Sequence, residues 1–144
     1  MLDALFPFHP RAVHFPIALA LVGALFAAIG LLWRRERWWG YGQISLLLAG
    51  LGMLTAGGTG LVDQARAPDD PVVVAIINLH ITAGIGLGVA IGLALYWPLR
   101  DKHLLSGSRG RWGYLALLAL IIALVLVEGW LGGRLVYDFG VGVR

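Results

Sequence analysis

Three histidines are the residues of this sequence whose type and position favour chemistry. His80 lies inside a long apolar stretch, where an imidazole needs a polar partner because an unsatisfied polar group in hydrocarbon is costly. Ionisable groups inside a membrane are functional candidates by default. Histidines on facing helices can ligate a haem iron or an ion such as copper or zinc. The sequence has no cysteine, which excludes disulfides, thiolate metal sites and a cysteine nucleophile.

The first hypothesis is a haem b site. His80, Gly84 and Gly88 follow one another at intervals of four residues and so share one helix face. The sequence predicts His14 and His80 as axial ligands, with Gly84 and Gly88 leaving room for the porphyrin. Two alternatives stay open: the glycines only let helices approach closely, and His80 donates a hydrogen bond to a carbonyl or to Asp63.

A second hypothesis is a metal site made of His9, His14 and His80. The spacing of His9 and His14 is not the helical interval of four, so the pattern alone is a weak signal. Glu128 is the single acid inside an apolar stretch, and we expect it to snorkel to the membrane interface. If it faces inward instead, it holds a histidine proton or pairs with Arg134.

Lipid is the expected environment of the elements that carry these residues. The chain has 144 residues, of which 59% are hydrophobic and 13% charged, and its mean hydropathy is +0.82. These values argue against a disordered chain and against a water-soluble globule. Stretches long enough to span a bilayer are 12–33, 41–62, 72–97 and 112–133. Short connections predict one all-α domain over 1–144, an integral membrane four-helix bundle that runs up-down-up-down.

Charges in the connections predict the orientation. Basic residues occur in the first and third connections (Arg34, Arg35, Arg37, Arg100, Lys102, Arg109 and Arg111), whereas the second connection carries three Asp and one Arg. The positive-inside rule places the first and third connections in the cytoplasm and both termini outside. Tyr114 is expected in the aromatic belt at a membrane edge, and the glycine-rich segment 132–143 is expected to be an extended tail. The net charge of +3 is not gathered on one face, so we expect no nucleic-acid partner.

The two ends of the chain resemble a known family. The sequences FHPRAVHFPIAL at 8–19 and GGRLVYDFGVGV at 132–143, with a helix-borne His80, resemble an uncharacterised family of small bacterial four-helix membrane proteins, a domain of unknown function. The resemblance implies a multi-pass protein of the bacterial inner membrane and supplies no established activity. In the family pattern His9, His14 and His80 occupy recurrent histidine positions, while Phe139 stands where a histidine is often found. Similarity to membrane b-type cytochromes is an analogy of fold only.

Two functions remain open from sequence alone. One is a haem-binding, electron-transfer subunit. The other is a non-catalytic accessory or structural subunit of a membrane complex, held to a partner or to a second copy through its glycine-rich helix faces. The serines (Ser45, Ser106 and Ser108) lie away from the histidines, which argues against a hydrolase and favours a protein with no catalytic activity of its own.

Overall fold

The structure is a computed structural model that describes residues 9–65, 67–101 and 107–141. In this part of the chain the elements are α1 (His9–Ala12), α2 (His14–Leu32), α3 (Glu36–Gln64), α4 (Pro71–Arg100) and α5 (Ser108–Tyr137). Four of the described helical segments, His9–Leu32, Glu36–Gln64, Pro71–Arg100 and Ser108–Tyr137, are long and apolar enough to cross a membrane. The prediction of an all-helical membrane bundle is confirmed.

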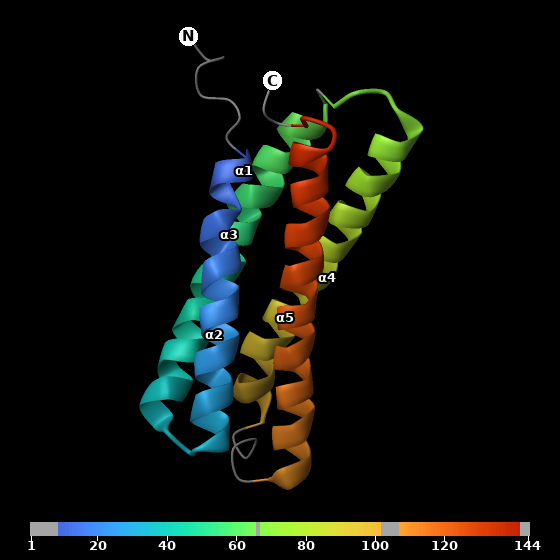
Figure 1. Cartoon of the computed structure of the whole chain (residues 1–144). Coiled ribbons are helices and arrows are strands. Elements are labelled where there is room, and N and C mark those ends of the chain that lie inside the picture. The colour runs from blue at the N-terminus through green and yellow to red at the C-terminus, as the bar shows by residue number, and fades with distance from the viewer. Residues whose placement is uncertain (1–8, 66, 102–106, 142–144) are drawn as a thin grey trace.

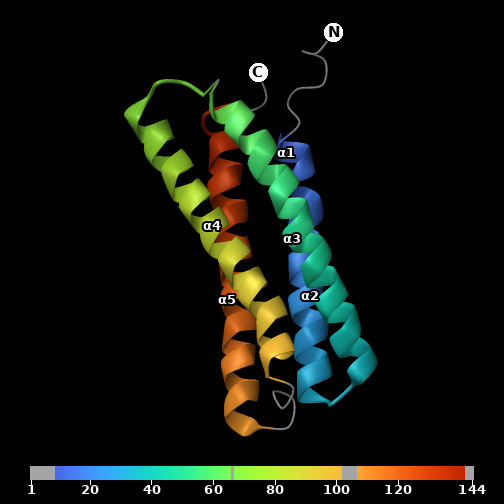
Figure 2. The ribbon, with the colours of Figure 1, turned by 180° about the vertical axis from the view of Figure 1, so that it is seen from behind.

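The long helices form an antiparallel bundle (Figures 1 and 2). Helix α2 contacts α3 and α5, and α4 contacts the same two helices, so each helix packs beside its neighbours in the chain. This is the predicted up-down-up-down order. Helix α1, the α3–α4 connection and the last turn of α5 lie at one end, which we call the histidine end. The α2–α3 connection, the end of α4 and the start of α5 lie at the other end, which we call the tyrosine end.

Helices α3, α4 and α5 extend beyond the predicted spans, because each predicted span stops before the nearest charged residue while the helix continues past it. Helix α3 begins at Glu36 and α5 begins at Ser108. The start of α4 has a strong local cause: the Asp70 carboxylate accepts a hydrogen bond of 2.7 Å from the Val72 amide, and Pro71 occupies the first helical position. A side-chain cap and a proline at this position both favour helix initiation.

The predicted extended tail is wrong over its described part. Helix α5 continues through Gly132 and Gly133 to Tyr137, because Leu131 and Leu135 are buried against apolar residues of α4. Tertiary packing here overrides the low helix propensity of glycine. The chain turns at Gly140, whose φ of 66° is left-handed, and the Val141 amide donates to the Leu135 carbonyl at 2.9 Å. Residues 142–143 of the predicted tail lie outside the described residues.

The closest helix contact is between α2 and α3. A Cβ added at Gly30 would collide with the backbone nitrogen of Trp39, and one added at Gly42 would collide with that of Ala27. Only glycine allows backbones this near, which is how membrane helices gain van der Waals contact. The glycines that allow the close contact of α2 with α3 are therefore not Gly84 and Gly88, which the spacing of four residues singled out in the sequence.

Apolar side chains form two clusters along the bundle. The larger, alanine-rich cluster joins α2, α3, α4 and α5 and includes Leu87 and Val125. The smaller joins α4 and α5 at the histidine end and contains Val73, Ile76, Ile77, Leu131 and Leu135. The sequence positions between these two clusters hold polar residues on both helices, and these form the candidate site.

Candidate functional site

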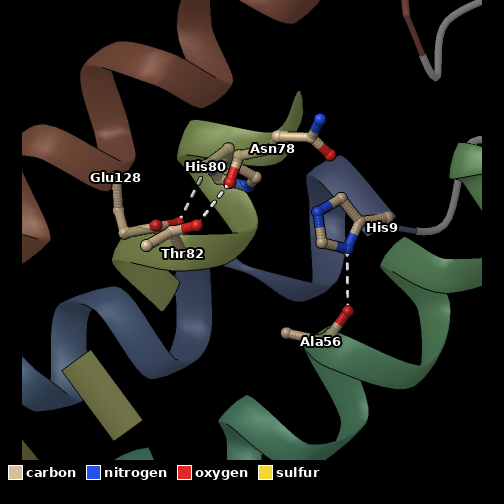
Figure 3. A network of polar contacts seen from close by, with 6 residues as sticks. All are labelled: His9, Ala56, Asn78, His80, Thr82 and Glu128. Atoms are coloured by element: carbon tan, nitrogen blue, oxygen red, sulfur yellow. Dashed lines mark hydrogen bonds and ion pairs between the residues drawn. The ribbon is translucent and has the colours of Figure 1, made fainter. Parts of the chain in front are cut away.

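His9 begins α1 and contacts the α3 backbone. Its Nδ1 lies 2.9 Å from the carbonyl oxygen of Ala56 and 3.1 Å from Thr59 Oγ1. A carbonyl can only accept a hydrogen bond, so the bond to Ala56 requires the proton on Nδ1. A neutral His9 in this geometry keeps the lone pair of Nε2 free. In Figure 3 that second nitrogen is on the edge of the ring toward His80.

His80 and Glu128 face each other across α4 and α5. His80 Nδ1 lies 2.9 Å from Glu128 Oε2, and the two side chains are 20% and 12% exposed. The two atoms are close but do not form an aligned hydrogen bond, since Nδ1 of His80 and Oε1 of Glu128 are buried without a hydrogen-bond partner in the described part of the chain. The expectation that Glu128 snorkels to the interface is wrong, and the inward alternative holds.

Each member of this pair lies beside a glycine of the opposite helix. A Cβ added at Gly132 on α5 would lie 3.4 Å from His80 Cε1, and one added at Gly84 on α4 would lie 3.5 Å from Glu128 Oε1. His80 lies four positions before Gly84, which faces Glu128. Likewise Glu128 lies four positions before Gly132, which faces His80. His9 has the same kind of neighbour, since a Cβ at Gly60 on α3 would lie 3.0 Å from its Cε1. The glycines leave space for the two imidazoles and the carboxylate.

The two imidazoles come together from separate helices. The ring centres of His9 and His80 are 6.3 Å apart, and their planes make an angle of 85° (Figure 3). We call His9, His80 and Glu128 the histidine cluster. It contains two rings whose Nδ1 atoms face an oxygen of another helix, which leaves each Nε2 to bind something else.

Other predicted site residues lie differently. The side chain of His14 is exposed on α2, and among the described residues no contact joins it to His80. Gly88 is near the Met53 side chain, with 3.8 Å from an added Cβ to the methionine methyl. Within the described ranges no three His, Asp or Glu side chains converge as a set that could hold a metal ion. The predicted set of His9, His14 and His80 is thus divided, with His9 and His80 together and His14 apart.

A second polar cluster occupies the tyrosine end of the bundle. The Tyr114 side chain is fully buried on α5; its hydroxyl donates to the Ala94 carbonyl at 2.7 Å and accepts from Gln43 Nε2 at 2.8 Å. Ala94 lies four residues before Pro98, which has no amide hydrogen to donate to that carbonyl. The tyrosine replaces the missing helical donor, as neighbouring helices often do in membranes. The expected place of Tyr114 in the interfacial belt is wrong.

The positions of Glu128 and Tyr114 fit a spacing in the sequence that predicts an inward-facing side of α5. The buried positions of α5 are 114, 118, 121, 125, 131 and 135, and position 128 continues their spacing of three and four. This is the pattern of a helix face that packs inward. His80 likewise continues the buried positions 73, 76 and 77 of α4. Two core-facing polar residues at matching places on neighbouring helices would have predicted their contact.

Comparison with known proteins gives a family and no activity. The chain belongs to the family described as predicted membrane protein (DUF2231), whose model matches residues 5–144. The family resemblance expected from the end motifs is confirmed. No curated protein and no solved structure shows significant similarity to the chain. With its apolar helices, the chain is a small multi-pass membrane protein in contact with the lipid bilayer.

Proposed function

We propose that this protein binds haem b between His9 and His80 and transfers electrons in the membrane. The observation that carries the proposal is the arrangement of the two imidazoles, whose Nδ1 atoms face Ala56 and Glu128 while their ring centres lie 6.3 Å apart. Metal-ligating histidines characteristically use their other ring nitrogen to contact a carbonyl or a carboxylate. His9 replaces His14 in the axial pair that the sequence predicted.

If haem b binds here, His9 and His80 would be the residues that hold its iron. Their ring centres, 6.3 Å apart, are close enough for one metal to lie between them. Gly60 lies beside the His9 ring and Gly132 beside the His80 ring, so these two glycines make room for the imidazoles where the rings come together.

The number of converging ligands favours haem over a bare ion. Structural zinc sites use four protein ligands and catalytic ones three, whereas haem needs only axial ligands because the porphyrin supplies four nitrogens. The Nε2 atoms of His9 and His80, for which the described residues offer no hydrogen-bond partner, match this requirement. Haem b supplies one-electron chemistry between ferric and ferrous iron. The chain's own contribution is to hold the two rings in place from α1 and α4.

The test is an absorption spectrum of the purified protein in detergent, oxidised and then reduced, after expression with ample haem. We expect a sharp Soret band that shifts on reduction in the wild type and is lost in His80→Ala. Retention of the full band in His80→Ala would overturn the axial assignment. A colourless protein that takes up no added haem would overturn the proposed function.

A non-catalytic accessory subunit is the second candidate, and specific glycines favour it. Gly57 and Gly58 on α3 and Gly92 on α4 are exposed, and a Cβ at each of these positions would meet nothing within 4 Å. Small residues that meet no neighbour in the described part of the chain leave room for a helix of another chain. This candidate predicts a colourless protein that is isolated with a second copy or another membrane protein.

The proposed orientation places the histidine end outside the cytoplasm. The first connection, at the tyrosine end, carries Arg34, Arg35 and Arg37, and the positive-inside rule keeps such loops in the cytoplasm. The α3–α4 connection at the histidine end is acidic instead, with Asp69 and Asp70. Both termini are then on the outer face of a bacterial inner membrane. A reporter fused after Arg144 is expected to be active outside, and activity in the cytoplasm would overturn this orientation.

A further inference from the structure

We infer that Glu128 is a positioning residue, whose carboxylate beside Nδ1 favours the proton of His80 on Nδ1 and so leaves the lone pair on Nε2. The inference rests on the proposed function, because its purpose is to prepare His80 as a ligand. It adds a role for the carboxylate and a difference in donor strength between the two imidazoles.

The distance and the burial support this role. Glu128 Oε2 lies 2.9 Å from His80 Nδ1, and the carboxylate is 12% exposed. An anionic oxygen this near repels a lone pair on Nδ1 and attracts a proton there, even where the N–H does not point straight at it. Little water reaches the pair, so this electrostatic preference is stronger than it would be at a surface.

The environment of Glu128 offers it no competing partner among the described residues. Arg134, on the same helix, instead pairs with Asp138, whose Oδ2 is 3.1 Å from its Nε. The second oxygen of Glu128, Oε1, is buried beside Gly84 without a hydrogen-bond partner in the described chain. The carboxylate is thus available to His80, and its location is fixed by the contact between α4 and α5.

The two histidines differ in what their Nδ1 atoms face. His9 Nδ1 faces a neutral carbonyl, that of Ala56, whereas His80 Nδ1 faces a carboxylate. A carboxylate partner raises the basicity of a ligating imidazole more than a neutral acceptor does. His80 should therefore be the stronger donor, and Glu128 should stabilise ferric over ferrous iron because it adds negative charge near the more positive metal.

The first measurement uses the protein without haem, so it is independent of the proposed function. Nitrogen-15 NMR of labelled protein in detergent micelles reports which ring nitrogen of His80 carries the proton, with the signal assigned by His80→Gln. We expect the Nδ1–H tautomer in the wild type and in Asp138→Asn, a control on the same helix. In Glu128→Leu, His80 should move to a mixture of tautomers. An unchanged His80 tautomer in Glu128→Leu would overturn the inference.

The second measurement uses protein reconstituted with haem b. Glu128→Leu should weaken haem binding by about 10–100-fold, the usual effect of removing such a partner. Glu128→Gln keeps the size of the side chain and removes its charge, so it should shift the midpoint potential to more positive values while Asp138→Asn leaves it unchanged. A purely structural contact would not move the potential, so an unchanged potential in Glu128→Gln would contradict the inference. If the wild type binds no haem, the proposed function fails while the tautomer still decides the role of Glu128.

Discussion

The two ends of the bundle each contain buried polar side chains, but they differ in how those side chains are satisfied. At the tyrosine end, the Tyr114 hydroxyl donates to Ala94 and accepts from Gln43, and Trp39 and Trp97 pack against its ring. At the histidine end, the pair His80 and Glu128 leaves buried atoms without hydrogen-bond partners in the described chain. A satisfied polar cluster in a membrane stabilises the fold, whereas a partly satisfied one costs stability and suggests a ligand.

The difference has a cause in the local sequence. Pro98 creates one unmet backbone acceptor on α4, and Tyr114 meets it from the neighbouring helix. The unpaired backbone acceptor and the hydroxyl that donates to it both belong to this chain. No comparable backbone defect explains His80 and Glu128, which lie between two apolar clusters on otherwise regular helices. We therefore propose a structural role for the first cluster and a binding role for the second.

The largest expected effect on stability follows from removing the hydroxyl at the tyrosine end. Tyr114→Phe should lower the free energy of unfolding by about 1–3 kcal/mol, since it leaves the Ala94 carbonyl and the Gln43 amide without this partner. Haem content should not change. The measurement is unfolding of the protein in mixed micelles by increasing amounts of denaturing detergent.

A matched variant isolates the cause of that effect. Pro98→Ala restores an amide that can donate to the Ala94 carbonyl, so Tyr114→Phe should cost less stability in this background than in the wild type. Equal losses in both backgrounds would show that the tyrosine does not compensate for the proline.

A smaller effect, of opposite sign, is expected at the histidine end. The double substitution His80→Leu/Glu128→Leu should leave the free energy of unfolding unchanged or raise it by about 1 kcal/mol, because apolar residues can replace a buried ionisable pair without loss. The same measurement in mixed micelles checks this. If the double variant is instead as destabilised as Tyr114→Phe, then the two ends do not differ in the way proposed.

The fold was largely predictable, since lipid imposes long apolar helices and short connections impose antiparallel packing. The end of α5 was not, because the packing of Leu131 and Leu135 outweighs two glycines that local propensity disfavours. The site was predictable only in part. His80 was evident as a polar residue in an apolar stretch, but its partner depended on the contact between α4 and α5.

The choice between His9 and His14 shows why sequence left the pair unresolved. The residues are five positions apart on one helical segment, His9–Leu32, and five residues turn by about 140° around a helix axis, so the two side chains face different sides. His9 turns toward α3 and α4, and His14 is exposed. The spacing of the motif puts the two histidines on different faces, but the packing against α3 and α4 decides which face is inward.

The central claim is that His9, and not His14, pairs with His80. The most direct measurement is the haem content per polypeptide and the reduced spectrum of His9→Ala beside His14→Ala, with both proteins purified and reconstituted identically. The account predicts that His14→Ala keeps the wild-type stoichiometry and six-coordinate spectrum, while His9→Ala loses haem or becomes five-coordinate. Loss of the wild-type spectrum in His14→Ala together with its retention in His9→Ala would contradict it.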